Sequence, residues 1–546
     1  MNNELAELLL PNINKDTKYY EDKYPKRNLK EDALVTRFAP SPTGFVHMGS
    51  LFASFINSVY AKQSGGVFFL RIEDTDSLRK VENGTESILR DLKAFGIYPD
   101  EGVSIGGEYG PYIQSERTEI YQTYVKELIK KGYAYPCFLT SEEEKEIKEE
   151  QELEKKQIGI YGHYAIDRDL TIEEVKDKIK QGLSYVIRLK STGNPNNYIT
   201  FNDLIKGEIK FPENNLDYVL LKKDKTPTYH LAHIVDDHLM RTNCVIRGDE
   251  WLSSVPFHLQ LSQVLGFTPN NYAHIAPITK KDNGKVRKLS KRLDPEAKVS
   301  YYDELGIPIE AVKLYLATIM NSNFEQWYLE NNDKSITDFT FNFDKQAIGG
   351  TLFDIDKLNN ISKTYFSRKS GEEVYQETLK YSKLFNIDYY NILLNNKDLM
   401  IKFLNIEKDG ARPRKDITKY SDVKDEFSYA IDDIFYKEKY SKYDGNKIYD
   451  YSLVMKYLET LDLSVTNEVW FAGVKDFCLD NNYAINNKEY KANPNIYTGT
   501  ISDFCEALRV IITGRTKTPD LFSIMQILGK EKIIARVDFY KKIVSK

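Results

Sequence analysis

Two short segments of the chain combine residue types that bind and transfer phosphate groups. The first, RFAPSPTGFVHMGS (37–50), is rich in proline and glycine and contains one histidine. The second, KLSKR (288–292), carries two lysines three positions apart, about 240 residues after that histidine. Imidazole N–H groups can donate to phosphate oxygens, and ammonium groups stabilise the charge that develops during phosphoryl transfer. Together the two segments predict a site for a nucleoside triphosphate.

The first segment runs into a predicted helix that extends from about residue 47 to 63. Free backbone N–H groups and the helix dipole favour a phosphate at the start of such a helix, beside His47. Gly49 has no Cβ, so a flat ring or a ribose can lie against its backbone. For an isolated His-x-Gly, the alternative is a rigid turn with a capping histidine.

Positive charge is distributed unevenly along the chain. Residues 280–292 include seven basic residues and one acid, and residues 496–546 include nine basic and five acidic residues, within a chain of net charge −5. Both excesses would attract a polyanion locally. A solvated run of charges is the alternative for each of them.

The apolar pattern around the first segment predicts a β-α-β unit. ALVTRF (33–38) reads as a strand, the loop and helix follow, and VFFLRIED (67–74) reads as the next strand. A right-handed crossover would make the two strands parallel, which favours a nucleotide-binding sheet. Further along, the pattern predicts a helix over 117–131, a solvated helix over 141–157, strands over 184–190 and 217–223, and mainly helices after about residue 301.

Length and composition narrow the class of protein. A chain of 546 residues exceeds what one hydrophobic core usually supports, so several domains are expected. No apolar run approaches the length of a membrane span, and residues 4–10 carry acids where a signal peptide is basic. The four cysteines form no Cys-x-x-Cys pair, which fits a reducing cytoplasm. Residues 1–32 read as an N-terminal extension with one short helix at most and no chemistry.

Several longer stretches resemble a known family. VHMG (46–49) and KLSKR resemble the HIGH and KMSKS signatures of class I aminoacyl-tRNA synthetases. The stretches similar to glutamyl-tRNA synthetases are RFAPSPTGFVHMGS, FLRIEDTD (69–76), TYHLAHIVDDHLM (228–240), VIRGDEWLSS (245–254), FDIDKL (353–358) of the stem-contact segment, and LRVIITGRTKTPDLFSIMQILGKE (508–531) of the bacterial-type anticodon-binding region. Relatives specific for glutamine usually show P-x-P-N-G and D-D-T-N, which this chain lacks.

The resemblance implies an α/β plus all-α architecture. A Rossmann-type parallel-sheet catalytic domain with an inserted acceptor-binding domain would be followed by helical stem-contact and anticodon-binding domains. The expected ranges are 1–32 for the N-terminal extension, 33–113 and 218–300 for the two halves of the catalytic domain, 114–217 for the inserted acceptor-stem-binding domain, 301–385 for the stem-contact domain, and 386–546 for the helical anticodon-binding domain.

The resemblance also implies roles for individual residues. Arg37 offers a planar fork suited to the substrate carboxylate, and Glu73 would hold the α-ammonium. The other implied substrate residues are Ala39, Ser41, Tyr229 and Arg247. The implied ATP-binding residues are His47, Gly49, Glu250, Trp251, Leu289 and Lys291, and the catalytic ones are His47, Gly49, Lys288 and Lys291. Phosphate contacts to tRNA are expected from Arg509, Arg515 and Lys517.

Three of these assignments have structural alternatives. Tyr229 and Trp251 could be plain core aromatics, and Arg247 could form an ion pair with Asp249 or Asp236. The role of His233 stays open, because it stands where a variable small or polar residue is expected.

The expected function is that of a monomeric, ATP- and Mg²⁺-dependent ligase that joins L-glutamate to tRNA-Glu, with tRNA-Gln as a second candidate acceptor. A glutaminyl enzyme and a non-catalytic tRNA-binding protein with a synthetase fold are the alternatives. Some family members carry a zinc site near the position of Cys137, but Leu139 stands here where a partner cysteine would be. We therefore expect no zinc.

Overall fold

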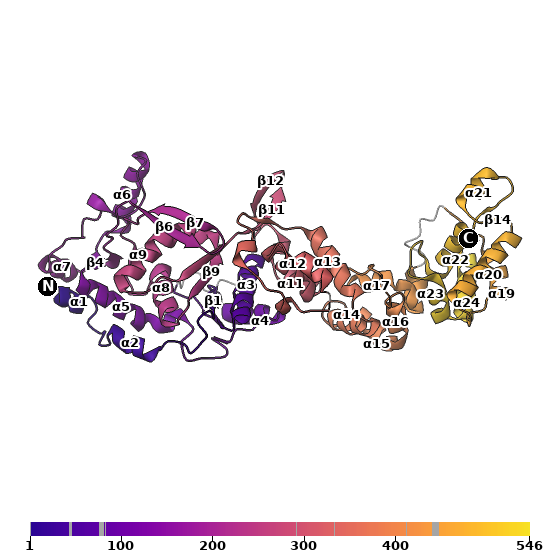
Figure 1. The fold of residues 1–546 in the computed structure, drawn as a ribbon, viewed down its shortest axis with the longest axis horizontal. Helices are drawn as coiled ribbons and strands as arrows, with labels where there is room; N and C mark the ends of the chain where they lie inside the picture. Colours follow the sequence, from indigo (N-terminus) through magenta and orange to yellow (C-terminus); the bar gives the residue numbers. More distant parts are fainter. Residues whose placement is uncertain are drawn as a thin grey trace. The chain divides into compact units, whose positions relative to one another are not determined.

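The computed structural model describes residues 2–42, 46–75, 81, 83–290, 292–331, 333–410, 412–438 and 447–545. The chain divides into two compact units (Figure 1). Unit 1 comprises residues 1–301 and 313–353, and unit 2 comprises residues 302–312 and 354–546. Each unit is described by itself.

A parallel sheet forms the centre of unit 1. β1 (Val35–Phe38) pairs in parallel with β2 (Val67–Leu70), which pairs in parallel with β3 (Glu101–Gly102). α3 (Met48–Ser64) connects β1 to β2, ending at Gly65 in the left-handed conformation. The predicted β-α-β unit is therefore confirmed, because the chain returns through one helix to a neighbouring parallel strand.

The sheet continues on the other side of β1. A hydrogen bond of 3.3 Å from Asn243 N to Val35 O joins β1 to the segment that enters β9 (Cys244–Gly248). β9 pairs in parallel with β10 (Asn271–Ile275), and β10 pairs in parallel with β6 (Tyr198–Asp203) at the residue pair Tyr272 and Asp203. β7 (Gly207–Pro212) forms an antiparallel hairpin with β6. The strand order reverses between β1 and β9, and ligands bind in the crevice at such a switch point.

A separate antiparallel sheet is formed by three strands that lie between β3 and β9 in the chain. β4 (Ala134–Cys137), β5 (Val186–Leu189) and β8 (Val219–Leu221) form it in the order 4-5-8. α6 (Ser141–Leu153) starts at a capping box formed by Thr140 and Glu143, and its glutamates face solvent, as a solvated helix should. The strands and the helix predicted in this region are confirmed.

The N-terminal extension contains two helices, so the expectation of one short helix at most is wrong. α1 (Asn2–Leu9) places Ala6 and Leu9 in the core of unit 1, and α2 (Thr17–Lys23) starts where the Asp16 side chain accepts from the Tyr19 backbone N–H. Neither helix is long enough to be stable alone. Burial against the rest of the unit stabilises them, and a sequence pattern confined to the extension could not reveal that.

The remaining helices and strands of unit 1 surround the parallel sheet or extend beyond it. They are α4 (Gly84–Ala94), α5 (Thr118–Lys131), α7 (Ile172–Lys180), α8 (Tyr229–Leu239), α9 (Val255–Leu265), β11 (Ile278–Asp282), β12 (Lys285–Lys288), α12 (Phe324–Glu330) and β13 (Thr351–Leu352). α10 (Ser300–Leu305) and α11 (Ile309–Met320) cross the boundaries between the units. β11 and β12 form an antiparallel hairpin that stands out in Figure 1.

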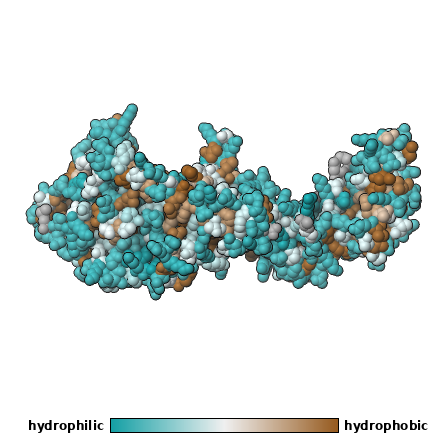
Figure 2. All heavy atoms as spheres, viewed as in Figure 1, coloured by the Kyte–Doolittle hydropathy of each residue, from teal (hydrophilic) through white to brown (hydrophobic). Residues whose placement is uncertain are grey.

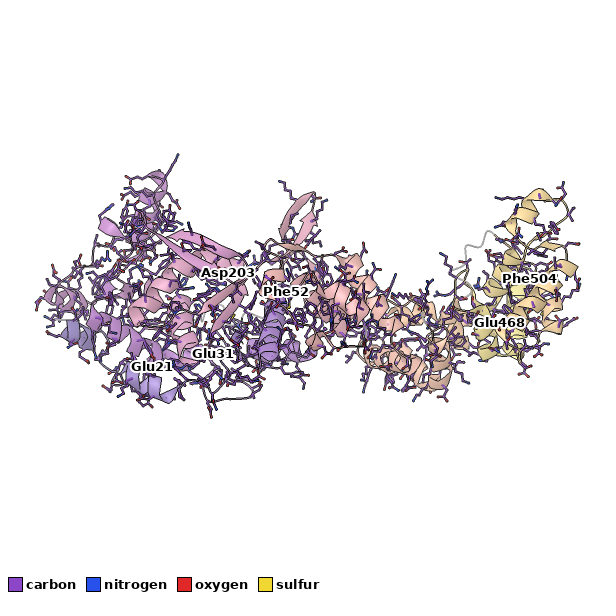
Figure 3. The ribbon with its side chains drawn as sticks, in the orientation of Figure 1. Glu21, Glu31, Phe52, Asp203, Glu468 and Phe504 are labelled. Atoms are coloured by element: carbon purple, nitrogen blue, oxygen red, sulfur yellow. The ribbon has the colours of Figure 1, made fainter. Side chains whose placement is uncertain are left out.

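Unit 2 is almost entirely helical, as the sequence predicts. Its elements are α13 (Ile355–Ser367), α14 (Gly371–Phe385), α15 (Ile387–Asn395), α16 (Lys397–Asn405), α17 (Asp422–Glu426), α18 (Asp432–Glu438), α19 (Tyr451–Thr460), α20 (Asn467–Asp480), β14 (Tyr483–Ala484), α21 (Asn487–Ala492), β15 (Gly499–Thr500), α22 (Ile501–Thr513), α23 (Leu521–Leu528) and α24 (Lys530–Val544). One hydrophobic core, which includes Phe504 (Figure 3), connects α13 to α24.

The surface is mostly hydrophilic, with apolar atoms gathered over the last helices of unit 2 (Figure 2). Val469, Phe471 and Leu479 of α20 are among the exposed apolar side chains there. No helix in the described parts of the chain has both the length and the apolarity needed to cross a membrane.

Candidate active site

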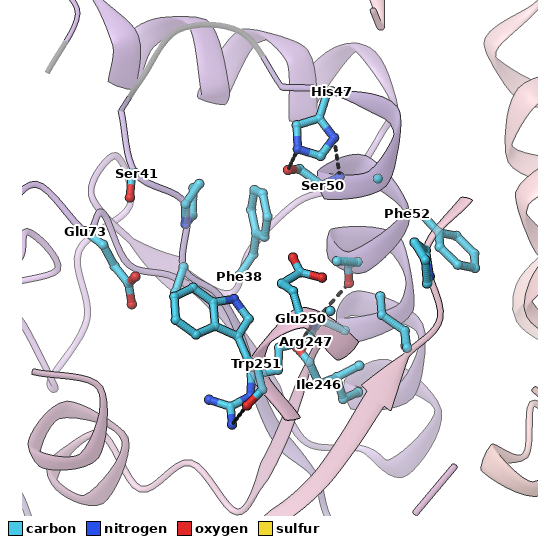
Figure 4. Close-up of a pocket in the computed structure, with 18 of the residues that line it drawn as sticks. Phe38, Ser41, His47, Ser50, Phe52, Glu73, Ile246, Arg247, Glu250 and Trp251 are labelled. Carbon is cyan, nitrogen blue, oxygen red and sulfur yellow. Dashed lines mark hydrogen bonds between the residues drawn. The ribbon is translucent and has the colours of Figure 1, made fainter. Parts of the chain in front are cut away.

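A cavity of about 590 Å³ opens at the carboxyl ends of β1 and β9, where the strand order reverses (Figure 4). It is lined by residues from both of the segments that predicted a triphosphate site. The predicted residues that line it are Arg37, Ala39, Ser41, His47, Gly49, Glu73, Tyr229, Arg247, Glu250, Trp251, Lys288 and Leu289. Lys291 lies outside the described residues. The tertiary fold thus brings together residues that are as far apart in the chain as Arg37 and Leu289.

Arg37 is held in the cavity wall by a carboxylate that the sequence did not single out. Its Nε lies 3.2 and 3.1 Å from the two oxygens of Asp237, and Arg71 Nη1 donates to Asp237 Oδ1 at 2.6 Å. Burial opposes ionisation of Asp237, but the charges of Arg37 and Arg71 outweigh it and hold its pKa well below the ordinary value. Asp237 therefore fixes Arg37 by its Nε edge and leaves the Nη1 group without a partner among the described residues.

The neighbouring Asp236 anchors the same helix, α8, through further side chains. It accepts from Arg117 Nε at 2.6 Å, from the Tyr121 hydroxyl at 2.8 Å and from the Gln114 amide at 3.0 Å. All of these side chains are buried. The signal that could have revealed this role is the pair of adjacent aspartates in TYHLAHIVDDHLM, because two buried carboxylates require cationic partners.

Glu73 follows β2 and presents a carboxyl group to the cavity (Figure 4). Its side chain is 9% exposed, and Arg71 Nη2 lies 3.3 Å from Oε1. Burial raises the pKa of the Glu73 carboxyl to about 7, against the opposing charges of Arg71 and Arg37. A buried carboxylate beside a cavity can hold an ammonium group, which would replace the lost hydration.

Tyr229 and Trp251 stack on each other at the cavity, with ring centroids 4.2 Å apart and planes at 30°. Both residues are of intermediate exposure and line the cavity, so they are not plain core aromatics. An offset aromatic pair of this kind offers a flat apolar surface to a ligand.

Arg247 does not form the ion pair proposed as its structural alternative. Asp249 pairs with Lys206 at 3.3 Å, and Asp236 pairs with Arg117. Arg247 instead donates to the Trp251 carbonyl at 3.3 Å (Figure 4) and lies among buried histidines, including His233.

His47 caps α3, as the structural alternative for this segment supposes, and it also lines the cavity. Its Nδ1 accepts from the Ser50 backbone N–H at 3.2 Å, so Nε2 carries the hydrogen and donates to Ser50 Oγ at 3.0 Å (Figure 4). A Cβ at Gly49 would lie 3.1 Å from His47 Cε1, so the glycine makes room for the imidazole. The capping contact orients an N–H donor beside the start of the helix, so the two interpretations of this motif are compatible.

The basic loop after β12 is tied down by Asp294, which the sequence did not single out. Asp294 accepts from Arg287 Nη1 and Nη2 at 2.6 and 2.8 Å and from the Ser290 backbone N–H at 2.7 Å. Arg287 is therefore committed to an internal contact. Lys288 Nζ lies 3.4 Å from Glu250 Oε2, and both side chains are more than half exposed, so this pair is weak and can exchange for a ligand.

The three predicted tRNA-binding residues differ in their environments. Arg515 donates to Glu426 at 2.9 Å and its side chain is 11% exposed, whereas Lys517 is exposed. Arg509 is partly buried, and its Nε has no hydrogen-bond partner among the described residues. Of the three, Lys517 is the most accessible to a phosphate.

Within the described parts of the chain, no three His, Cys, Asp or Glu side chains are placed to hold a metal ion. Cys137 is a buried free thiol, and burial raises its pKa, which disfavours the thiolate that zinc binds.

Comparison with known proteins agrees with this geometry. The family described as tRNA synthetases class I (E and Q), catalytic domain, matches residues 33–360, and the family described as Anticodon binding domain matches residues 499–540. A glutamate–tRNA ligase of Clostridium beijerinckii is 46% identical over 549 residues, covering 99% of both chains. One of Clostridium perfringens (strain 13 / Type A) is 45% identical over 541 residues, covering 98% of this chain and 99% of the relative.

A solved structure is similar over most of the chain. It is a glutamate tRNA ligase from Elizabethkingia meningosepticum in complex with its amino acid, 29% identical, with a TM-score of 0.74 over 93% of this chain and 99% of that one. The first family match covers more than half of the chain, and the relatives match it almost from end to end. The chain therefore belongs to the class I aminoacyl-tRNA synthetases, in the family specific for glutamate and glutamine.

Proposed function

We propose that the chain is a glutamate–tRNA ligase, which activates L-glutamate with ATP and transfers it to the 3′ end of tRNA-Glu. One observation carries the substrate assignment: two buried arginines, Arg37 and Arg247, and one carboxyl group that is only 9% exposed, Glu73, line the same cavity. An amino acid with an acidic side chain has the complementary charges. The relatives named glutamate–tRNA ligase support the same assignment.

The reaction proceeds by two displacements. An oxygen of the glutamate α-carboxylate attacks the α-phosphorus of ATP, the bond to the β-phosphate breaks, and pyrophosphate leaves. A ribose hydroxyl of the terminal tRNA nucleotide then attacks the carbonyl carbon of glutamyl-adenylate, and AMP leaves. No covalent enzyme intermediate is required, so the residues act by position and charge.

The two sequence motifs act on the triphosphate. The Nε2–H of His47 turns from Ser50 to a phosphate oxygen, and the start of α3 adds backbone N–H donors. Lys288 leaves Glu250 for the phosphates as negative charge develops. Lys291, together with Lys288, is assigned to the transition state from the motif alone. Leu289 and the aromatic pair of Tyr229 and Trp251 shape the walls.

Mg²⁺ would neutralise part of the charge of the triphosphate. No cluster of metal-binding side chains occurs among the described residues, so we assign no protein ligands to it and derive no step through it. We also propose that the protein holds no zinc, and elemental analysis of the purified chain checks this directly.

We propose that the parts of the chain divide the recognition of tRNA as the sequence predicts. The stretch 114–217 would bind the acceptor stem, residues 301–385 would contact the stem, and residues 386–546 would read the anticodon. The anticodon-binding match over residues 499–540 supports the last role. A monomeric enzyme in the cytoplasm is the proposed state, and the free thiols fit a reducing compartment.

ATP–pyrophosphate exchange separates this proposal from its alternatives. A glutamate–tRNA ligase exchanges with glutamate and not with glutamine, a glutaminyl enzyme does the reverse, and a non-catalytic tRNA-binding protein exchanges with neither. Each amino acid is assayed with and without tRNA-Glu and tRNA-Gln, which also shows whether activation requires tRNA.

The same assay tests the assignment of Arg37. Arg37→Ala should raise the KM for glutamate by a factor that corresponds to about 2–4 kcal/mol, because a substrate carboxylate loses its buried cation. The KM for ATP should change little. Asp237 keeps Arg71 in the variant, which protects the fold. A normal KM for glutamate in Arg37→Ala would remove the substrate assignment.

A further inference from the structure

The Arg247 guanidinium is surrounded by hydrogen-bond acceptors, most of which are histidines. Its Nε donates to His274 Nε2 at 3.0 Å, and its Nη1 lies 3.3 Å from His233 Nε2. Its Nη2 lies 3.3 Å from both the Trp251 carbonyl and His258 Nδ1. A guanidinium has five N–H bonds. Within the described residues these contacts occupy four of them, and one N–H of Nη1 is left for a ligand.

Two of the histidines have their tautomers determined by carboxylates. His274 Nδ1 lies 2.6 Å from Asp203 Oδ2, and His233 Nδ1 lies 2.9 Å from Asp237 Oδ2. An ionised carboxylate only accepts hydrogen bonds, so Nδ1 carries the hydrogen in both rings. Each Nε2 then has a lone pair, which Arg247 requires. The opposite tautomer would set an N–H against the guanidinium and a lone pair against the carboxylate.

The third histidine, His258, has the opposite tautomer and extends the series of hydrogen bonds to His230. His258 must accept from Arg247 through Nδ1, so its hydrogen is on Nε2 and is donated to His230 Nδ1 at 2.9 Å. His230 in turn carries its hydrogen on Nε2. Protonation of any ring that faces Arg247 would replace an acceptor with a donor and add a second positive charge beside the guanidinium.

The surroundings keep these rings neutral. Burial and the charge of Arg247 lower the pKa of His230 to about 4, and burial lowers that of His233 to about 3 although Asp237 opposes the shift. Burial also lowers the pKa values of His258 and His274, although at His274 the hydrogen bond that Nδ1 donates to Asp203 opposes the shift. Other charged and titratable groups that face the rings are Arg37 from β1, Lys206 after β6, Tyr229 from α8 and Tyr272 from β10.

We propose that His274, His258 and His233 are positioning residues, which act as neutral acceptors that hold the Arg247 guanidinium with one N–H free for the amino acid substrate. The inference rests on the proposed function, in which Arg247 belongs to the glutamate pocket. Holding the arginine in advance removes the cost of ordering a long side chain when the substrate binds. It also gives a reason for His233, whose role the sequence left open.

A matched pair of substitutions at His274 tests the acceptor role. The amide oxygen of His274→Gln can reach the place of Nε2 and accept from Arg247, whereas His274→Asn reaches only the place of Nδ1. We expect the Asn variant to raise the KM for glutamate at least tenfold, with kcat and the KM for ATP within threefold of the parent. In the Gln variant, the KM for glutamate, kcat and the KM for ATP should each stay within threefold of the parent values. His163→Gln, at an exposed site, is the control for losing a histidine.

Two results at His274 would overturn the proposal. One is an equal rise in the KM for glutamate in the Gln and Asn variants. The other is a change in the KM for ATP as large as that for glutamate, which would indicate a structural role.

Imidazole ¹⁵N NMR of the intact, histidine-labelled chain provides a second test that requires no stable variant at the centre of the network. We expect Nδ1–H tautomers at His233 and His274, Nε2–H tautomers at His230 and His258, and no protonation of these rings between pH 8 and 5.5. A cationic ring or the opposite tautomer at His274 or His233 would overturn the inference.

Arg247→Lys separates this inference from the proposed function. An unchanged KM for glutamate in that variant would remove Arg247 from the substrate pocket, while the tautomers measured in the parent chain would still report on the network itself. The expected result is a KM for glutamate raised at least tenfold, because a lysine cannot occupy the same set of acceptors.

Discussion

At the residue scale, the fold shifts the pKa of Glu73 into the pH range in which most enzymes work. Burial raises its pKa to about 7, and the nearby cations Arg71 and Arg37 only partly oppose this. Only the ionised form attracts an ammonium group. A proton on Glu73 therefore competes with the α-ammonium of the amino acid that the cavity is proposed to bind.

The first prediction concerns pH. Because the raised pKa keeps Glu73 partly protonated up to about pH 7, kcat/KM for glutamate should rise with pH toward 7 and level off above it. Below that value it should fall by up to about tenfold per pH unit. Pyrophosphate exchange between pH 5.5 and 8.5 measures this. Glu73→Gln should bind glutamate more weakly at pH 8, and its kcat/KM should no longer rise with pH. If the rise persists in this variant, another group is responsible for it.

At the element scale, α2 and the segment that follows it hold the C-terminal end of α8. Glu21 of α2 (Figure 3) accepts from His238 at 2.7 Å and from Arg241 at 2.9 Å. Arg27 donates to the Met240 carbonyl at 3.1 Å. The other end of α8 carries the residues of the site, so the extension stabilises the helix on which the pocket is built.

The second prediction is that Glu21→Gln destabilises unit 1. Burial disfavours the Glu21 carboxylate, but hydrogen bonds from His238 and Arg241 outweigh it and lower the pKa to about 2 from 4.5. This stabilisation is present above pH 4.5 and is lost as the pH falls toward 2. The side chain is 36% exposed, so solvent screening limits the loss at pH 7 to about 1 kcal/mol.

Urea unfolding of the full chain at pH 7 measures this loss. Glu31→Gln is the matched control, because Glu31 is an exposed residue of the same extension. Equal unfolding midpoints for the two variants would show that the contacts of Glu21 contribute nothing to stability.

At the scale of the whole molecule, unit 2 must keep a helical core while it presents cations to a polyanion. Residues before and after the predicted boundary at 385 and 386 share that core, including Val374 on one side and Leu393 on the other. A truncation there would cut through packed side chains. Substitutions in the full chain therefore test tRNA binding better than shortened chains do.

The third prediction compares two cations of unit 2. Lys517→Ala should weaken tRNA binding and reduce the slope of log affinity against log salt by about 1, without a change in melting temperature. Arg515→Ala should lower the melting temperature, because it leaves Glu426 without its partner. Filter binding at several salt concentrations and thermal unfolding measure both. An unchanged salt slope in Lys517→Ala would show that Lys517 does not contact the tRNA backbone.

The sequence predicted the residues of the cavity much better than the contacts that hold them. Arg37, His47 and Lys288 lie in contiguous motifs whose residue types already indicate their chemistry, and the structure places all three at one cavity. Asp237 and Asp294 were missed, because an aspartate in the sequence does not show which cation it will pair with. Their partners become visible only when the strands are assembled.

The sequence by itself determined the family, the fold class and most of the proposed site, because local patterns of glycine, proline, histidine and lysine carry that information. Only the tertiary structure decided that the extension folds into two helices, that burial raises the pKa of Glu73 to about 7, and that Arg247 is held by histidines rather than by an acid. The physical reason is common to these three findings. Burial and pairing depend on groups far apart in the chain, and the dielectric environment of a side chain exists only after the chain has folded.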